Sequence, residues 1–209
     1  KFINFFLNKE NTLNVNNEDI ENSHFFKIKK IVGTMDFKFD VKDLDILTDR
    51  SFSIKNIKKS KYIILHYDEK WSNETYISTY VDIEPSKVQL LNFINNIRYK
   101  SGDEIFITTG VKTPKILTNI ISAIDDDKVR LIESLNFTQL ETIVSNSKLL
   151  ISCHGAISHV ASAYNIRQID IIDINNQNPY ENWTHHFRNY HSLYRKKFSI
   201  LSSEISNLL

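Results

Sequence analysis

From residue 61 onward, short apolar runs alternate with segments in which apolar residues recur every three or four positions. A continuous apolar run such as Tyr62–His66 is typical of a strand that is buried on both faces. The intervening segments have the periodicity of amphipathic helices. Five strands are therefore expected, at Tyr62–His66, Ile105–Thr108, Val129–Ile132, Leu149–Ser152 and Gln168–Ile172.

Local signals mark where several of the helices begin. Ser86 and Gln89 have the spacing of a capping box, and Pro114 stands where a first helical position tolerates proline. A further helix is expected near Ser202–Leu209. The helix after Gly155 has one apolar face, formed by Ile157, Val160, Ala161 and Tyr164.

Strands and helices that alternate in this way form right-handed βαβ units and a parallel sheet. The sequence thus predicts an α/β, Rossmann-like fold with helices on both faces and the strand order 3-2-1-4-5. The winding direction then reverses between the first and fourth strands, and ligands bind at the carboxyl ends of strands at such a switch point. The loops expected to meet there are 66–71 and 153–155.

Residues 1–60 have a different composition, rich in Asn, Asp and Lys, with Phe25–Val32 as the best candidate for a strand. We therefore expect two regions, 1–60 and 61–209, the second ending in a C-terminal tail. The sequence begins at Lys1 and its one methionine is Met35. It is accordingly expected to be part of a longer product.

Composition narrows the class of protein. The 26 basic and 25 acidic residues leave a net charge of +1, which argues against a nucleic-acid binder. The single cysteine, Cys153, excludes an internal disulfide and suits a reducing compartment. The apolar stretch 2–7 is too short to cross a membrane and lacks the features of a signal peptide.

The strand-to-helix junction at Cys153-His154-Gly155-Ala156 is the main candidate for a binding site. It presents free backbone N–H groups at the positive end of a helix, which attracts phosphate, and Gly155 lets a ligand approach the backbone. The alternative is that the glycine serves only the turn. His154 is suited to donate to a phosphate or a sugar hydroxyl, or else to cap its own helix.

Lys70 lies in the loop expected to face this junction, where an ammonium group can neutralise a diphosphate. It can equally be a solvated loop lysine, whereas Trp71 is expected to pack in the core. Thr109-Gly110 and Glu133-Ser134 follow the second and third strands and are candidates for binding a base and ribose. Glu133 can also be a surface acid.

Several chemistries are not indicated. The spacing of His185, His186 and His191 matches no common zinc pattern. The sequence lacks the glycine motifs of dinucleotide-binding proteins and P-loop NTPases, and the nucleophile elbow of hydrolases.

Residues 62–173 resemble the C-terminal, donor-binding half of GT-B glycosyltransferases, most closely the ADP-heptose:lipopolysaccharide heptosyltransferase-like family. The resemblance rests on Lys70-Trp71 after the first strand, on the segment Ile151–Ala163, and on the strand Gln168–Ile172. The chain departs from the family pattern at Cys153-His154, where an Asp-Thr pair is usual, and lacks the Pro-Gly opening of the loop after the first strand.

The resemblance implies transfer of a sugar from a nucleotide-diphosphate donor to a glycan or lipid-linked acceptor, in cell-surface polysaccharide or lipopolysaccharide synthesis. It implies no cofactor, no metal and no nucleic-acid partner, and a cytoplasmic location with contact to the inner face of the membrane as an option. The diphosphate would be bound by Lys70, His154, Gly155 and Ala156, and the base and ribose by Thr109, Gly110, Glu133 and Ser134.

Region 1–60 is too short for the acceptor-binding domain of such an enzyme. We therefore interpret it as an extension or as the remnant of an acceptor domain, and no residue can be named as the catalytic base. The alternative is a non-catalytic nucleotide- or glycan-binding or assembly module.

Overall fold

The computed structural model describes residues 62–72, 80–173, 180–184 and 187–209, together with Thr34. The strand expected at 25–32 lies outside the described residues, as do His185 and His186. The chain divides into two compact units, one formed by residues 1–46 and 175–186 and the other by 47–174 and 187–209. The first unit contains the short helix α8 (Glu181–Thr184), and the second contains the sheet and the helices described below.

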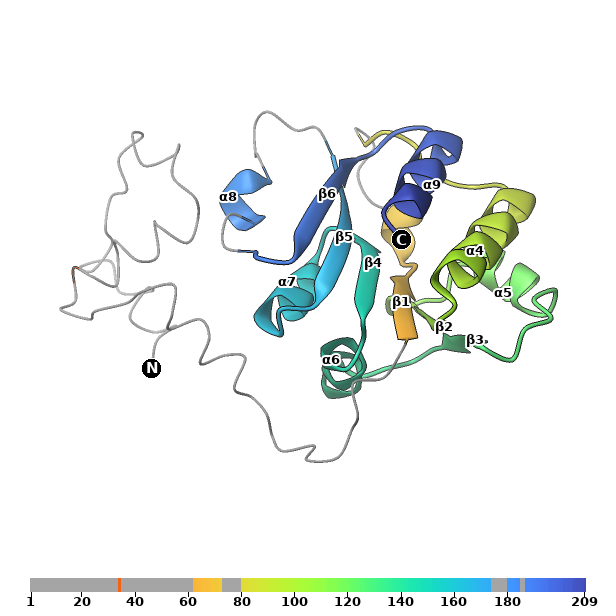
Figure 1. Ribbon diagram of the computed structural model, residues 1–209, viewed down its shortest axis with the longest axis horizontal. Coiled ribbons are helices and arrows are strands. Elements are labelled where there is room, and N and C mark those ends of the chain that lie inside the picture. Colours follow the sequence, from red (N-terminus) through yellow and green to blue (C-terminus); the bar gives the residue numbers. More distant parts are fainter. Residues whose placement is uncertain (1–33, 35–61, 73–79, 174–179, 185–186) are drawn as a thin grey trace. The chain divides into compact units, whose positions relative to one another are not determined.

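The second unit is built on one parallel sheet whose six strands have the order β3-β2-β1-β4-β5-β6 (Figure 1). All five neighbouring pairs are parallel. The strands are β1 (Tyr62–His66), β2 (Glu104–Thr108), β3 (Val129–Ile132), β4 (Leu149–Cys153), β5 (Arg167–Ile172) and β6 (Tyr190–Tyr194). The expected α/β fold, its five strands and their order are confirmed.

The sixth strand is an addition that the sequence pattern did not indicate. β6 pairs with β5 from Gln168 opposite Tyr190 to Ile172 opposite Tyr194. Three of its five residues are exposed and the other two are only partly buried. It therefore lacks the continuous apolar run by which the central strands are recognised.

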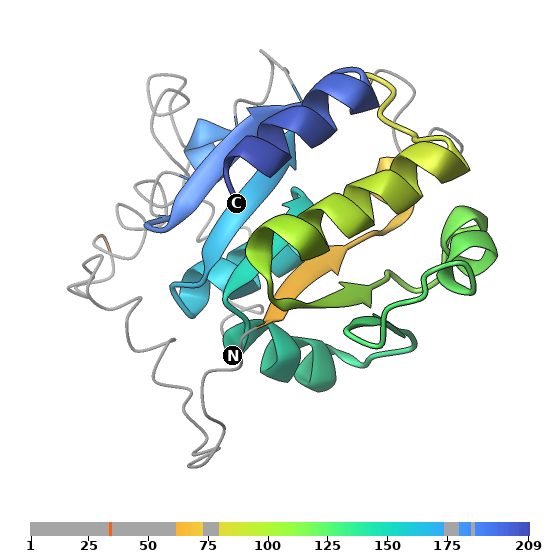
Figure 2. The ribbon, with the colours of Figure 1, turned by 45° about the vertical axis from the view of Figure 1, so that its right-hand side comes forward.

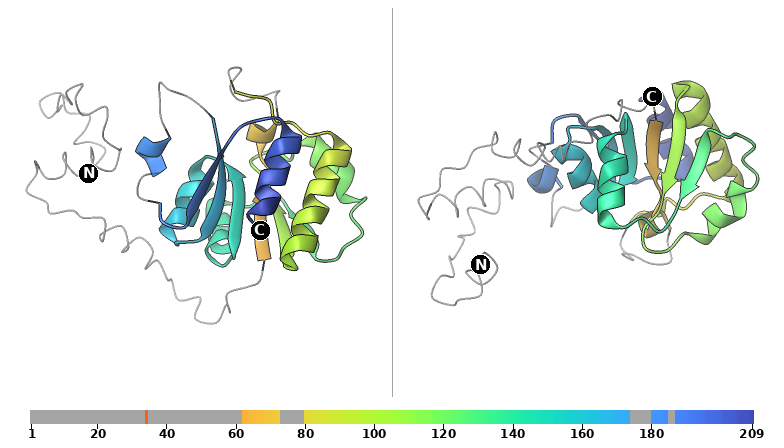
Figure 3. Two further views of the ribbon diagram at one scale, coloured as in Figure 1. Left: turned by 45° about the horizontal axis from the view of Figure 1, so that its top comes forward. Right: turned by 90° about the horizontal axis from the view of Figure 1, so that it is seen from below.

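Helices cover both faces of the sheet, each over its own apolar core (Figure 3). On one face lie α4 (Lys87–Ser101), α5 (Lys115–Ile121) and α9 (Phe198–Asn207). On the other lie α6 (Phe137–Ser145) and α7 (Ala156–Ala163). α4 and α5, which follow β1 and β2, cover one face, whereas α6 and α7, which precede and follow β4, cover the other. The winding direction therefore reverses between β1 and β4.

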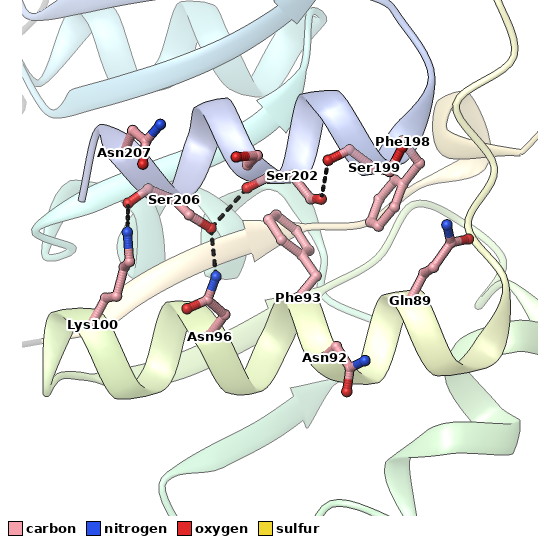
Figure 4. Close-up of a pocket in the computed structure, with 11 residues that line it drawn as sticks. Gln89, Asn92, Phe93, Asn96, Lys100, Phe198, Ser199, Ser202, Ser206 and Asn207 are labelled. Atoms are coloured by element: carbon pink, nitrogen blue, oxygen red, sulfur yellow. Dashed lines mark hydrogen bonds between the residues drawn. The ribbon is translucent and has the colours of Figure 1, made fainter.

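α4 and α9 lie side by side and run in the same direction (Figure 2). At one end Phe93 meets Phe198 edge to face at 5.5 Å. At the other, Asn96 Nδ2 donates to Ser206 Oγ and Lys100 Nζ donates to the Ser206 carbonyl, both at 2.8 Å (Figure 4). A groove of about 340 Å³ separates the helices, and none of its lining residues comes from the loops after β1 or β4.

The helix starts agree with the sequence in one case and differ in another. Both hydrogen bonds of the capping box between Ser86 and Gln89 are present at the start of α4. Pro114 does not occupy the first helical position of α5. It is the residue before the helix, which begins at Lys115.

α9 begins four residues earlier than expected and ends at Asn207. Among the described residues, no helix is long and apolar enough to cross a membrane.

The cap of α4 gives a first test of how this helix is held. Replacing Ser86 by Ala removes the acceptor for the Gln89 N–H and leaves a donor at the helix start without its partner. The Ser86→Ala variant should lose about 1 kcal/mol of unfolding free energy. Urea denaturation followed by circular dichroism measures this loss. Ser203→Ala, which changes an exposed serine within α9, is the control and should lose less than about 0.5 kcal/mol; equal losses would contradict the capping role.

Candidate functional site

The candidate site lies where β1 and β4 end side by side. These two central strands are neighbours in the sheet, and their following connections leave in opposite directions. After β1 the chain forms the short 3-10 helix η4 (Glu69–Trp71), and after β4 it enters α7 through His154 and Gly155. The two loops predicted from the sequence are therefore adjacent, at the carboxyl edge of the sheet.

Lys70 reaches across from η4 to the start of α7. A Cβ built on Gly155 would lie 2.5 Å from Lys70 Nζ, so the absent side chain makes room for the ammonium group. Lys70 Nζ also donates to Asp68 Oδ2 at 2.8 Å. Burial lowers the pKa of Lys70, but the charge and hydrogen bond of Asp68, together with the charge of Glu69, outweigh burial and raise the pKa above its ordinary value. The ammonium group is therefore charged at neutral pH.

The first N–H groups of α7 are only partly available. The His154 N–H donates to the carbonyl of Ile171 at 2.9 Å, and the Gly155 N–H donates to Ser158 Oγ at 3.3 Å. Ala156 opens the helix, where an N–H has no acceptor in its own helix. A phosphate would thus meet the Ala156 N–H directly and would compete with Ser158 for that of Gly155.

The His154 side chain is held by a buried carboxylate that sequence reasoning did not identify. Its Nδ1 lies 2.5 Å from Asp170 Oδ2, and its side chain is 12% exposed. Asp170, on β5, is fully buried and also accepts from Ser158 Oγ at 2.8 Å and from Tyr190 Oη at 3.1 Å. Asp170 therefore orients His154 and fixes the start of α7 to β5 and β6.

A second buried cluster supports the loop after β1. Trp71 is fully buried and donates from Nε1 to the His66 carbonyl at 2.9 Å, which confirms its expected packing role. His66 Nδ1 lies 2.9 Å from Thr108 Oγ1, and its Nε2 lies 3.6 Å from Asp68. Burial lowers the pKa of His66, against the charge of Asp68 and in line with that of Lys70.

The residues predicted to bind base and ribose lie along the same edge of the sheet. A Cβ on Gly110 would lie 2.7 Å from Glu69 Oε2, so the loop after β2 packs against η4. Thr109 is buried. Glu133 is exposed and accepts a hydrogen bond from Thr113, and Ser134 has a φ of 57°. β3 lies three strands from β4 in the sheet, and neighbouring strands are about 4.8 Å apart. Glu133 and Ser134, which follow β3, are therefore farther from Gly155 than Thr109 and Gly110, which follow β2.

His159 and Cys153 have structural surroundings. The His159 ring contacts those of His154 and Phe187, at 5.4 and 5.1 Å. Cys153 is buried and unpaired, and burial raises the pKa of its thiol well above the ordinary value. His191 is exposed on β6. Within the described part of the chain, no three His, Cys, Asp or Glu side chains gather as metal ligands would.

Solved structures of bacterial sugar transferases share this architecture. Heptosyltransferase WaaC of E. coli with ADP is similar at a TM-score of 0.53 and 11% identity, over 78% of this chain and 48% of that one. ADP-heptose lps heptosyltransferase II of E. coli gives a TM-score of 0.51 at 11% identity, over 79% of this chain and 51% of that one. No protein-family model and no curated protein matches the sequence.

The sheet and its helices have the Rossmann-like α/β fold found in these GT-B glycosyltransferases. It resembles the heptosyltransferases, as the motifs around Lys70 and Gly155 predicted. The chain spans about half the length of the two solved structures. At this level of identity the likeness establishes the fold, and the chemistry has to be argued from the residues of this chain.

Three residues of the site escaped sequence reasoning, and two of them carried a signal. Asp68 stands two positions before Lys70, the spacing of a carboxylate that binds the backbone two residues on. Asp170 is a charged residue inside an apolar strand, which requires a buried partner. Arg195 follows β6 and donates to the Lys70 carbonyl at 2.9 Å; because β6 itself was not expected, nothing placed this arginine near the site.

The buried imidazole of His66 predicts a pH dependence of stability. Its pKa is lowered from 6.5 in the folded protein, so the unfolded chain binds the proton first as the pH falls. The stability that His66 contributes should be complete above about pH 7.5 and should decline below about pH 6.5. His66→Asn, which retains a partner for Thr108, should remove this decline. Urea unfolding of both proteins from pH 8 to pH 5 measures it, with the exposed His191→Asn as control; parallel curves for wild type and His66→Asn would refute the prediction.

The hydrogen-bond network around Asp170 predicts that Asp170→Asn, which hardly changes the size of the side chain, strongly lowers the free energy of unfolding. His154, Ser158 and Tyr190 share the two carboxylate oxygens of Asp170. Asp170→Asn removes the buried charge and leaves one acceptor oxygen for these three side chains. The variant should lose roughly 2–4 kcal/mol of unfolding free energy. Tyr190→Phe removes a single donor and should lose about 1 kcal/mol. Urea denaturation compares the two, and an Asp170→Asn variant as stable as the wild type would exclude the network as a structural anchor.

Proposed function

We propose that this chain is the nucleotide-sugar-binding part of a glycosyltransferase, and that Lys70 and the start of α7 bind the diphosphate of the donor. The observation that carries the proposal is the closeness of Lys70 Nζ to Gly155, where a Cβ would lie 2.5 Å from the ammonium nitrogen. A charged ammonium group and the amino end of a helix point at one place, at the topological switch of the sheet. Both features attract a diphosphate, and the likeness in fold to GT-B enzymes supports the same ligand class.

In the proposed reaction, the bond between the anomeric carbon of the sugar and the diphosphate oxygen breaks, and its electron pair stays on the diphosphate. The acceptor hydroxyl forms the new bond to the anomeric carbon and gives its proton to a base. Negative charge therefore develops on the leaving diphosphate, where Lys70 and the Ala156 N–H are suited to stabilise it. No described residue is assigned as the base.

The other nucleotide contacts follow from the same placement. We propose that Thr109 and Gly110 lie beside the ribose and that Glu133 and Ser134 lie toward the base, because β2 and β3 lead away from the diphosphate loops. The donor sugar, the glycan or lipid-linked acceptor, the contribution to cell-surface polysaccharide synthesis and the contact with a membrane face belong to the proposal as well. So does binding without a metal, since Lys70 and the amino end of α7 offer N–H donors to the diphosphate.

Calorimetric titration of the full chain with ADP, UDP, GDP and CMP tests the proposal. At least one nucleotide should bind, and EDTA should leave the affinity unchanged. Lys70→Ala should weaken binding at least about tenfold, because a charge-assisted contact is lost. Gly155→Val should act in the same direction, since its side chain needs the space that Lys70 Nζ occupies.

Lys128→Ala is the matched control, because Lys128 is exposed and lies at the amino end of β3. It should leave the affinity unchanged. If none of the four nucleotides binds to the folded protein, the donor-binding proposal fails. The alternative, a non-catalytic binding module, predicts nucleotide binding with no release of the sugar from any nucleotide sugar supplied with acceptors.

A further inference from the structure

We propose that Arg195 is a positioning residue for Lys70 and adds to the diphosphate site a positive charge that no carboxylate pairs. The inference rests on the proposed function and extends it to a residue that no motif marks. Arg195 directly follows β6, the strand that the sequence pattern did not indicate. Its guanidinium group is buried, with 6% of the residue exposed.

The guanidinium group ties together three segments that border the site. Its Nη2 donates to the Lys70 carbonyl at 2.9 Å, and its Nε donates to the Val81 carbonyl at 3.0 Å, just before α4. Its Nη1 lies 3.6 Å from Cys153 Sγ, at the end of β4. One planar group thus fixes the backbone of Lys70 relative to the strand that leads into Gly155, which is the geometry that sets the Lys70–Gly155 contact.

The charges at the site show why a second cation matters. The ammonium of Lys70 is paired with Asp68 at 2.8 Å, so this pair has no net charge. The carboxylate of Asp170, which faces His154, and that of Glu69, which acts on Lys70 from the next position, add negative charge nearby. A phosphate approaching Gly155 would therefore meet no surplus of positive charge from Lys70.

Arg195 adds a positive charge that is not paired with a carboxylate. None of the ion pairs among the described residues includes it, and its neighbours there are two carbonyls, a thiol and the ring of Tyr80, 5.1 Å from the guanidinium carbon. The neighbouring thiol stays neutral, because burial raises the pKa of Cys153 well above its ordinary value. A buried cation without a carboxylate costs free energy, and an anion bound at the adjoining loop would offset this cost.

A row of aromatic contacts also connects the segment of Arg195 to the loop of Lys70. Trp71, the residue after Lys70, stacks on Tyr67 at 5.1 Å and contacts Phe93 at 6.4 Å. Phe93 in turn meets Phe198, three residues beyond Arg195, at 5.5 Å. The segment that carries Arg195 and the loop that carries Lys70 are therefore joined both by a hydrogen bond and through a row of buried rings.

The test compares Arg195→Gln with Lys197→Gln, which removes the same charge from an exposed position two residues away. Both proteins and the wild type are titrated with ADP, AMP, adenosine and inorganic pyrophosphate in a calorimeter. Arg195→Gln should weaken ADP and pyrophosphate roughly tenfold, AMP less, and adenosine not at all, because a charge effect grows with the charge of the ligand. Lys197→Gln should differ from the wild type by less than about twofold, since solvent and salt screen an exposed charge.

The positioning of Lys70 by Arg195 can be measured separately, without a ligand. Acetic anhydride labels exposed amines, and mass spectrometry reports the extent of labelling at Lys70. Lys70 should react several-fold faster in Arg195→Gln than in the wild type, because its backbone is no longer held. Arg195→Lys keeps the charge but loses the planar group, so it should restore most of the pyrophosphate affinity and leave Lys70 more reactive; it also serves if Arg195→Gln does not fold.

The outcomes separate the two proposals. If the wild type binds ADP and pyrophosphate, and Arg195→Gln binds them as Lys197→Gln does, Arg195 supplies no charge to the site and this inference is wrong. Equal losses for adenosine and ADP, with Lys70 no more reactive, would also overturn it and indicate a general packing role. If the wild type binds no nucleotide and no pyrophosphate, the proposed function and the charge contribution fail together, and the labelling of Lys70 alone decides whether Arg195 positions it.

Discussion

The reversal of winding between β1 and β4 is the constraint on which the rest of this structure depends. A parallel sheet sends every chain connection across one of its faces, and here the connections change faces between two neighbouring strands. The strand ends at the reversal therefore have no helix packed over both of them. The sheet itself thus brings the loop of Lys70 and the start of α7 together, and the side chains complete an opening that the topology has created.

Each loop at this opening is held by its own buried carboxylate. Asp68 binds the backbone and the ammonium group of Lys70, and Asp170 binds His154, Ser158 and Tyr190. Buried carboxylates require such partners, since an unpaired charge away from water is costly. The consequence is a site whose polar groups are oriented before a ligand arrives, which reduces the reorganisation that binding requires.

The same pairing limits what the site can offer an anion. Lys70 and Asp68 cancel in charge, and the Gly155 N–H is already engaged by Ser158. The attraction for phosphate must then come from the Ala156 N–H, from the end of α7 and from a cation whose charge is not compensated. This is why the buried guanidinium of Arg195, contributed by the outer strand region, bears on a site formed by the central strands.

The sequence by itself determined five of the six strands, the helix faces and the location of the switch point, because buried strands form short apolar runs and helices impose their period. It also brought forward Lys70 and Gly155, through loop position alone. It could not indicate β6, whose mostly exposed residues form no such run, or the pairing of His154 with Asp170, 16 residues apart. Arg195 was equally hidden, because its contacts with Lys70 and Cys153 span 125 and 42 residues. Only the packed sheet decides which distant charges meet, since each such pair forms through the spatial order of strands and leaves no periodic trace in the chain.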